Sequence, residues 1–125
     1  MAVTLDNQAQ AAKFLYRATF GPKGSDVADL LETGVDNWLE QQFNIPPQLH
    51  LNLAREYAKV NNTVTNKQSR RGAWWYRTLY AEDQLRQRVA YALSEIFVLS
   101  TFNGGPRDDE ALIAYYDLLL NHASL

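Results

Sequence analysis

The sequence contains no cysteine, which excludes disulfide bonds and thiolate metal sites. It also has no apolar run close to the roughly 20 residues that a membrane-spanning helix requires. β-Branched aliphatic residues are scarce, since Val and Ile together number 10 whereas Leu and Ala together number 32. Strands favour β-branched side chains and helices favour unbranched ones, so this composition argues against an all-β domain.

What is present has the composition of a globular protein. The chain has 125 residues, of which 46% are hydrophobic and 21% charged, values that exclude wholesale disorder. This length suits a single domain, so we expect one helical domain over residues 1–125. Residues 1–6 lack the basic stretch followed by an apolar one that marks a signal peptide.

Capping residues and helical spacing predict about seven helices and no strand. The polar segment 61–67, which reads NNTVTNK, is the clearest loop between them. From Ala90 onward the sixth helix is apolar around almost its whole circumference, so we expect it in the middle of an irregular all-α bundle. The expected helices span about 6–20, 25–34, 37–43, 47–60, 69–82, 84–100, and from 105 or 108 to the C-terminus.

The last helix stays apolar up to the C-terminus, where residues 118–125 read LLLNHASL. Domain ends are usually polar and frayed. We therefore expect residues 1–125 to be the N-terminal fragment of a larger helical domain. The C-terminal helix would then pair with the rest of that domain or with a second copy of the chain.

Charge is distributed unevenly along the chain. Residues 1–54 carry three basic and six acidic side chains, residues 55–88 eight and three, and residues 89–125 one and five. The central basic block could face an anionic partner or pair with the acidic flanks after folding. The formal net charge of only -2 favours pairing within the chain.

The residues offer little catalytic chemistry. His50 and His122 lie 72 positions apart, and neither has a second ligand at helical spacing, so we expect no metal site. The sequence also has no Gly-x-Ser-x-Gly turn and no glycine-rich phosphate loop, and we expect no cofactor.

Glu95 is the one candidate for catalysis, since it lies in the most apolar stretch of the chain. A buried carboxylate must be paired or protonated. One interpretation is a general acid or base. The other, which we favour, is a structural ion pair with Arg88 or Arg17 that fixes how the helices pack.

The segment 70–77, RRGAWWYR, interleaves basic and aromatic residues and is a possible binding surface. Helical spacing places Trp75 and Leu79 on one face, which suggests that Trp75 is core and Trp74 is free. The surface would therefore consist of Arg70, Arg71, Trp74 and Arg77. A pI near 5.6 argues against nucleic acid as its partner.

Four segments carry a family resemblance. Residues 12–22 read AKFLYRATFGP, 34–43 read GVDNWLEQQF, 83–90 read DQLRQRVA and 115–123 read YYDLLLNHA. In this order, over nearly the whole chain, they resemble a large bacterial family known as domain of unknown function 1800. The resemblance implies a longer helical domain, often in exported proteins.

The resemblance implies no mechanism. Many relatives have F-W-H-x-H-F where residues 92–97 read ALSEIF, so Ser94 and Ile96 replace the two histidines. A metal or acid–base role of those histidines cannot be transferred to this chain.

Three hypotheses of function result. The leading one is a structural or protein-interaction helical module of an exported or envelope-associated bacterial protein. The alternative is the N-terminal part of an enzyme whose catalytic residues lie mostly beyond residue 125. The third is an anion- or nucleic-acid-binding surface on residues 67–88.

Overall fold

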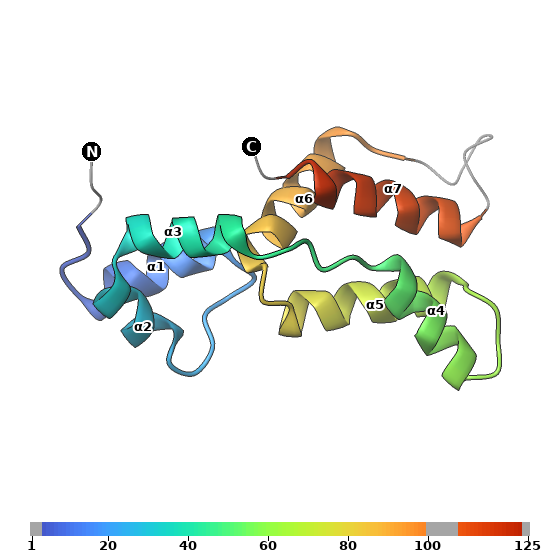
Figure 1. The fold of residues 1–125 in the computed structure, drawn as a ribbon, viewed down its shortest axis with the longest axis horizontal. Coiled ribbons are helices and arrows are strands. Elements are labelled where there is room, and N and C mark those ends of the chain that lie inside the picture. The colour runs from blue at the N-terminus through green and yellow to red at the C-terminus, as the bar shows by residue number, and fades with distance from the viewer. Residues whose placement is uncertain (1–3, 100–107, 124–125) are drawn as a thin grey trace.

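The computed structural model describes residues 4–99 and 108–123, and these residues form seven α-helices and no strand (Figure 1). The all-α prediction is therefore confirmed. No helix in these ranges combines the length and apolar character needed to cross a bilayer. The helices are α1 (Gln8–Ala18), α2 (Asp26–Thr33), α3 (Val35–Asn44), α4 (Leu51–Val60), α5 (Lys67–Tyr80), α6 (Gln84–Ile96) and α7 (Asp109–Asn121).

Side-chain caps explain where several helices begin. Asn7 caps α1 by accepting a hydrogen bond from the backbone N–H of Gln10, so the helix begins at Gln8, close to the expected start near residue 6. Asn66 and Ser69 form a reciprocal capping box, so α5 begins at Lys67, at the end of the predicted loop and two residues before the expected start at 69. Asp108 caps α7, as its position in the sequence predicts.

Helix α6 joins two groups of helices (Figure 1). Helices α1–α3 lie at one end of the molecule and α4, α5 and α7 at the other, while α6 contacts α1, α3, α5 and α7. Each group has its own apolar core. The first is built on Ala11, Leu15, Leu30 and Val35, and the second on Ala54, Ala73 and Ile113.

The prediction for the apolar end of α6 is wrong. The helix ends at Ile96 rather than near residue 100, and Ile96, Phe97, Val98 and Leu99 are exposed. Its buried positions are instead Arg86, Gln87 and Ala90. The reason is that the N-terminal half of α6 lies at the junction of the two helix groups. This half therefore contributes polar side chains to the interior.

The start of α4 also differs from the prediction. Residues 46–49 are irregular, and the helix begins at Leu51 instead of at Pro47. Asp117 of α7 determines this start, since its Oδ1 accepts the N–H of His50 at 2.7 Å and its Oδ2 accepts that of Leu51 at 3.0 Å. A carboxylate at the first amides of a helix also matches the positive end of the helix dipole.

A second buried carboxylate holds the segment that precedes α4. Asp83 Oδ2 accepts the backbone N–H of Gln48 at 2.9 Å, and Gln87 Nε2 donates to the carbonyl of Gln48 at 2.9 Å. Burial raises the pKa of Asp83, while its hydrogen bonds with Gln48 and Gln87 act in the opposite direction. Side chains at the start of α6 and in the C-terminal half of α7 thus form the hydrogen bonds that the backbone of residues 48–51 would otherwise form within a longer helix.

Two ion pairs attach α7 to the helices beneath it. Arg55 of α4 contacts Glu110 at 2.7 Å, and Arg70 of α5 contacts Asp109 at 2.8 Å. Hydrogen bonding from Arg55 lowers the pKa of Glu110 to about 2. These pairs confirm that part of the basic block at residues 55–88 is neutralised by the acidic C-terminal flank.

Replacing Asp117 tests the cap on α4. We expect Asp117→Ala to lower the free energy of unfolding by about 2–3 kcal/mol, because two backbone amides lose their common acceptor. Asp117→Asn should cost less, since its amide oxygen still accepts one of them. Urea unfolding measures both effects. Glu56→Gln, on the exposed side of α4, is the control, and an equal loss in all three variants would contradict the cap.

Candidate functional site

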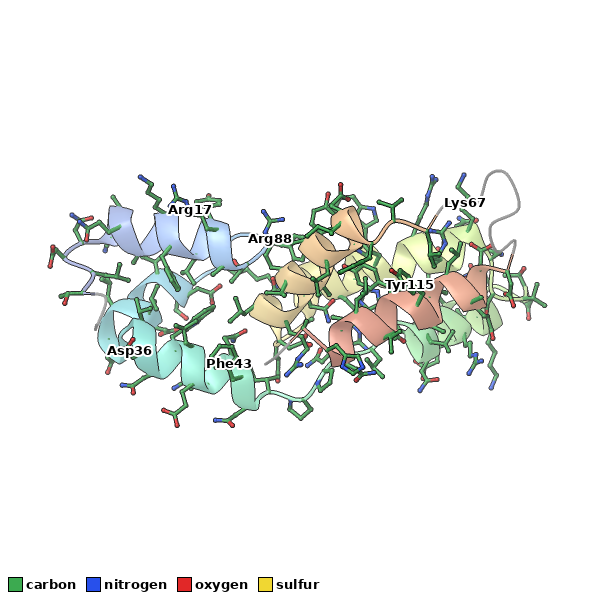
Figure 2. All side chains as sticks on the ribbon, turned by 90° about the horizontal axis from the view of Figure 1, so that it is seen from above. Arg17, Asp36, Phe43, Lys67, Arg88 and Tyr115 are labelled. Atoms are coloured by element: carbon green, nitrogen blue, oxygen red, sulfur yellow. The ribbon has the colours of Figure 1, made fainter. Side chains whose placement is uncertain are left out.

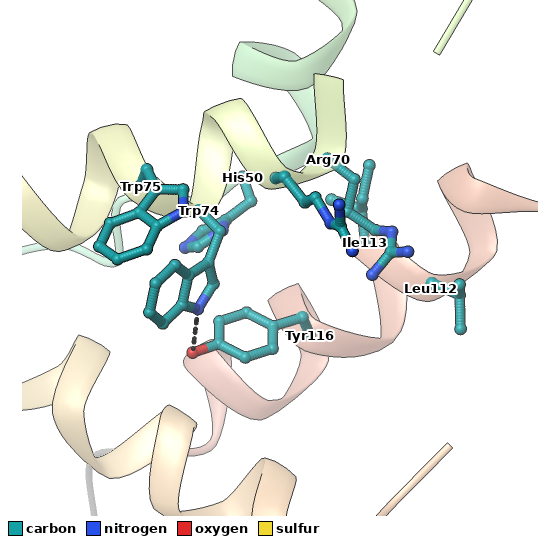
Figure 3. Close-up of a pocket in the computed structure, with 8 residues that line it drawn as sticks. His50, Arg70, Trp74, Trp75, Leu112, Ile113 and Tyr116 are labelled. Atoms are coloured by element: carbon teal, nitrogen blue, oxygen red, sulfur yellow. Dashed lines mark hydrogen bonds between the residues drawn. The ribbon is translucent and has the colours of Figure 1, made fainter. Parts of the chain in front are cut away.

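A cavity of about 260 Å³ lies between α5 and α7, with the residue that precedes α4 at its base (Figure 3). Helix α5 contributes one wall and α7 the other. The residues that line it are His50, Arg70, Arg71, Trp74, Trp75, Leu112, Ile113 and Tyr116. Most are apolar or aromatic, with cationic groups from α5.

Helical spacing explains how these side chains converge. Trp74 follows Arg70 by four positions, and Tyr116 follows Leu112 by four, so each pair shares a helix face. The two faces meet where Trp74 Nε1 donates a hydrogen bond to Tyr116 Oη at 3.3 Å, the dashed line in Figure 3. The Tyr116 ring also lies 4.9 Å from the imidazole of His50.

His50 is buried, and its hydrogen bonds fix its proton. Gln87 donates its amide N–H groups to Gln48 and Asp83, so its Oε1 is the atom that faces the imidazole. His50 Nε2 lies 2.8 Å from this oxygen and must therefore donate. Burial lowers the pKa of His50, although Gln87 and the charge of Asp117 act in the opposite direction. The base of the cavity is thus a neutral imidazole.

The remaining polar groups give the cavity positive charge. Arg70 is neutralised by Asp109, but Arg71 is exposed and forms no ion pair with any residue that the structure describes. Burial raises the pKa of Tyr116 to about 12, so its side chain is a neutral hydroxyl at physiological pH. A cation beside an aromatic wall can bind an anion that carries an apolar body.

The predicted surface on α5 is only partly correct. Arg70, Arg71 and Trp74 lie at one cavity, but Arg77 turns away and donates two hydrogen bonds to the carbonyl of Leu49. The roles of the two tryptophans are reversed. Trp75 is 57% exposed, whereas Trp74 is half-buried against Phe20, Tyr91 and Tyr116.

The premise for Glu95 is wrong, because this residue is exposed near the end of α6. Glu95, Arg17 and Arg88 surround one shallow hollow between α1 and α6, and Figure 2 shows Arg17 and Arg88 on the same side of the molecule. None of the three forms an ion pair within the described ranges. Arg88 instead lies over the rings of Phe20 and Tyr91, at 5.4 and 5.7 Å.

Sequence reasoning missed His50 and Tyr116 as parts of a site. They are 66 positions apart, and no spacing or motif connects them. As for metals, the described part of the chain contains no group of three His, Asp or Glu side chains close enough to hold an ion. The groups that line the cavity are apolar, aromatic and cationic, with the neutral imidazole of His50.

The buried imidazole predicts a dependence of stability on pH. With its pKa below 6.5 in the folded state, His50 binds a proton more readily after unfolding. Stability is therefore fully present above pH 6.5 and falls as the pH is lowered through the interval between the two pKa values. We expect His50→Gln to flatten this decline in urea unfolding series between pH 7.5 and 5.

Two comparisons isolate the contribution of His50. The raised pKa of Asp83 gives the opposite slope just above pH 3.8, so the difference between wild type and variant is the quantity to measure. His122→Gln removes an exposed imidazole and is the matched control. Equal slopes for wild type and His50→Gln would contradict the assignment.

Comparison with known proteins identifies the family. No curated protein and no solved structure matches the chain. A family model described as a protein of unknown function, DUF1800, matches residues 13–124. This match covers nearly the whole sequence and confirms the resemblance carried by the four segments. The chain therefore belongs to the DUF1800 family of proteins of unknown function.

Proposed function

We propose that this helical domain is a protein-interaction module, and that its docking surface is the exposed face of α5. Trp75, Tyr76, Leu79 and Tyr80 form this face, which we call the α5 stripe, and they are 57%, 51%, 46% and 64% exposed. Single exposed apolar residues are ordinary, whereas a contiguous group marks an interaction site. This row of large side chains on one helix is the observation that carries the proposal.

The α5 stripe is ordered by its own contacts. The rings of Tyr76 and Tyr80 lie 5.0 Å apart, one helical turn from each other. Lys23 Nζ lies 5.5 Å from the centre of the Tyr80 ring. The opposite side of the helix is anchored in the protein through buried Ala73 and Thr78. An arrangement that is already ordered loses little conformational entropy when a partner binds.

The charges around the α5 stripe define the chemistry of its partner. Exposed Lys67 and Arg71 lie at the N-terminal end of α5. At the other end, near Tyr80, exposed Asp26, Asp29 and Glu82 outnumber the single cation Lys23. A helix of 14 residues is about 21 Å long. The occupant that fits is an amphipathic helical segment of another protein, with an apolar middle, an acidic end and a basic end.

Localisation in an exported or envelope-associated protein is part of the same proposal. It is supported only by what the family resemblance implies. The enzymatic alternative, with its catalytic residues mostly beyond residue 125, gains no support from Glu95, because this residue is exposed and not in the apolar interior that made it a candidate.

Peptide selection tests the docking surface. A phage library of random 15-residue peptides is selected on the immobilised domain. We expect the enriched peptides to have an apolar, aromatic-rich middle with acidic residues toward one end and basic residues toward the other. Binding of synthetic copies should weaken at least tenfold in Tyr76→Ala/Tyr80→Ala, since such anchors dominate interface energies. Circular dichroism checks that this variant is folded.

Phe43→Ala is the matched control, because Phe43 is an exposed aromatic residue on α3. It should leave peptide affinity unchanged. Failure to enrich any peptide, or affinity that survives the double substitution, would overturn the proposal. Concentration-dependent dimerisation that the double substitution abolishes would make a second copy of the chain the occupant and would also overturn it.

A further inference from the structure

The cavity between α5 and α7 has the dimensions of a small-ligand site. Its volume of about 260 Å³ lies just below the range of about 300–1,000 Å³ for sites that hold drug-sized molecules. Ile113, Leu112 and the aromatic rings give it a mainly apolar lining. The space therefore suits a compact molecule with one ring.

The walls favour a flat apolar body. Trp74 and Trp75 meet edge to face, with ring centres 5.1 Å apart. Tyr116 is held opposite by the hydrogen bond that it accepts from Trp74. Aromatic pairs prefer edge-to-face or offset-stacked contacts, and these rings offer both faces and edges to a ligand.

The polar groups favour a single negative charge. Asp109 neutralises Arg70 and does not line the cavity, whereas Arg71 retains its full charge at the lining. His50 is neutral, so it adds no second cation. The oxygen of Tyr116 accepts from Trp74, and none of the described residues accepts the proton of its hydroxyl group. The Arg71 guanidinium is thus the cation available to a carboxylate.

We propose that this cavity binds a small aromatic monocarboxylate. Its ring lies against Trp74 and Tyr116, and its carboxylate accepts hydrogen bonds from the Arg71 guanidinium. The proposal goes beyond docking at the α5 stripe, because Tyr76, Leu79 and Tyr80 do not line the cavity and Trp75 alone belongs to both. A small-molecule site that adjoins the docking surface at Trp75 is a second activity of the domain.

Three probes of graded chemistry test the site by isothermal titration calorimetry and by quenching of tryptophan fluorescence. Phenylacetate has both ring and charge, phenylacetamide has the ring without the charge, and acetate has the charge without the ring. We expect phenylacetate to bind in the micromolar to millimolar range and each of the other two to bind at least tenfold more weakly. Equal affinity for phenylacetate and phenylacetamide would overturn the assigned role of Arg71.

Variants locate the binding. Arg71→Gln should weaken phenylacetate at least tenfold, whereas Lys59→Gln, which removes an exposed cation from α4, should not. Leu112→Trp should fill the cavity and abolish binding without changing peptide selection at the α5 stripe. Absence of phenylacetate binding to the wild type at millimolar concentration, or binding that survives Leu112→Trp, would overturn the proposal and leave the docking proposal intact.

Discussion

Two buried carboxylates hold an irregular segment in the middle of the protein, and the positions of the helices around it depend on them. Asp117 accepts the first amides of α4, and Asp83 accepts that of Gln48, so residues 48–51 are bound to both α6 and α7. Backbone polar groups in this position would otherwise be buried without partners. The same contacts place His50 beneath Trp74 and Tyr116. The cavity therefore depends on Asp83 and Asp117, because these side chains accept the backbone N–H groups of residues 48, 50 and 51 and so hold His50 in place.

The burial pattern of α6 is the reverse of the one expected from hydrophobicity alone. Arg86 and Gln87 are buried, while the apolar residues at the end of the helix are exposed. Arg86 donates to the carbonyls of Ile45 and Leu120 and thus connects the ends of α3 and α7. Such networks specify one arrangement of helices, because few alternatives satisfy every donor. The exposed apolar residues leave the domain with surface suited to further contacts.

The sequence was sufficient for features that depend on near neighbours. The loop at 61–67 and the capping residue Asp108, one of two expected starts of the last helix, predict helix boundaries to within a few residues, because caps and loops act over three or four positions. The start of α4 was not predictable in this way, since its acceptor lies 67 positions away from His50. Trp74 and Trp75 were exchanged because helical spacing defines two faces of α5 but not which one α7 covers. The cavity was missed for the same reason, because its walls meet only in the folded chain.

The two separate apolar cores have a consequence for the internal motions of the domain. Leu15 and Leu30 belong to one core and Ala73 and Ile113 to the other, and neither core contains a residue of α6. Proteins open in cooperative units whose free energies follow their own buried contacts. Helices α1–α3 can therefore loosen while α4, α5 and α7 keep their packing. Amide hydrogen exchange would then occur at two distinct rates in the two halves of the molecule, with α6 as the border between them.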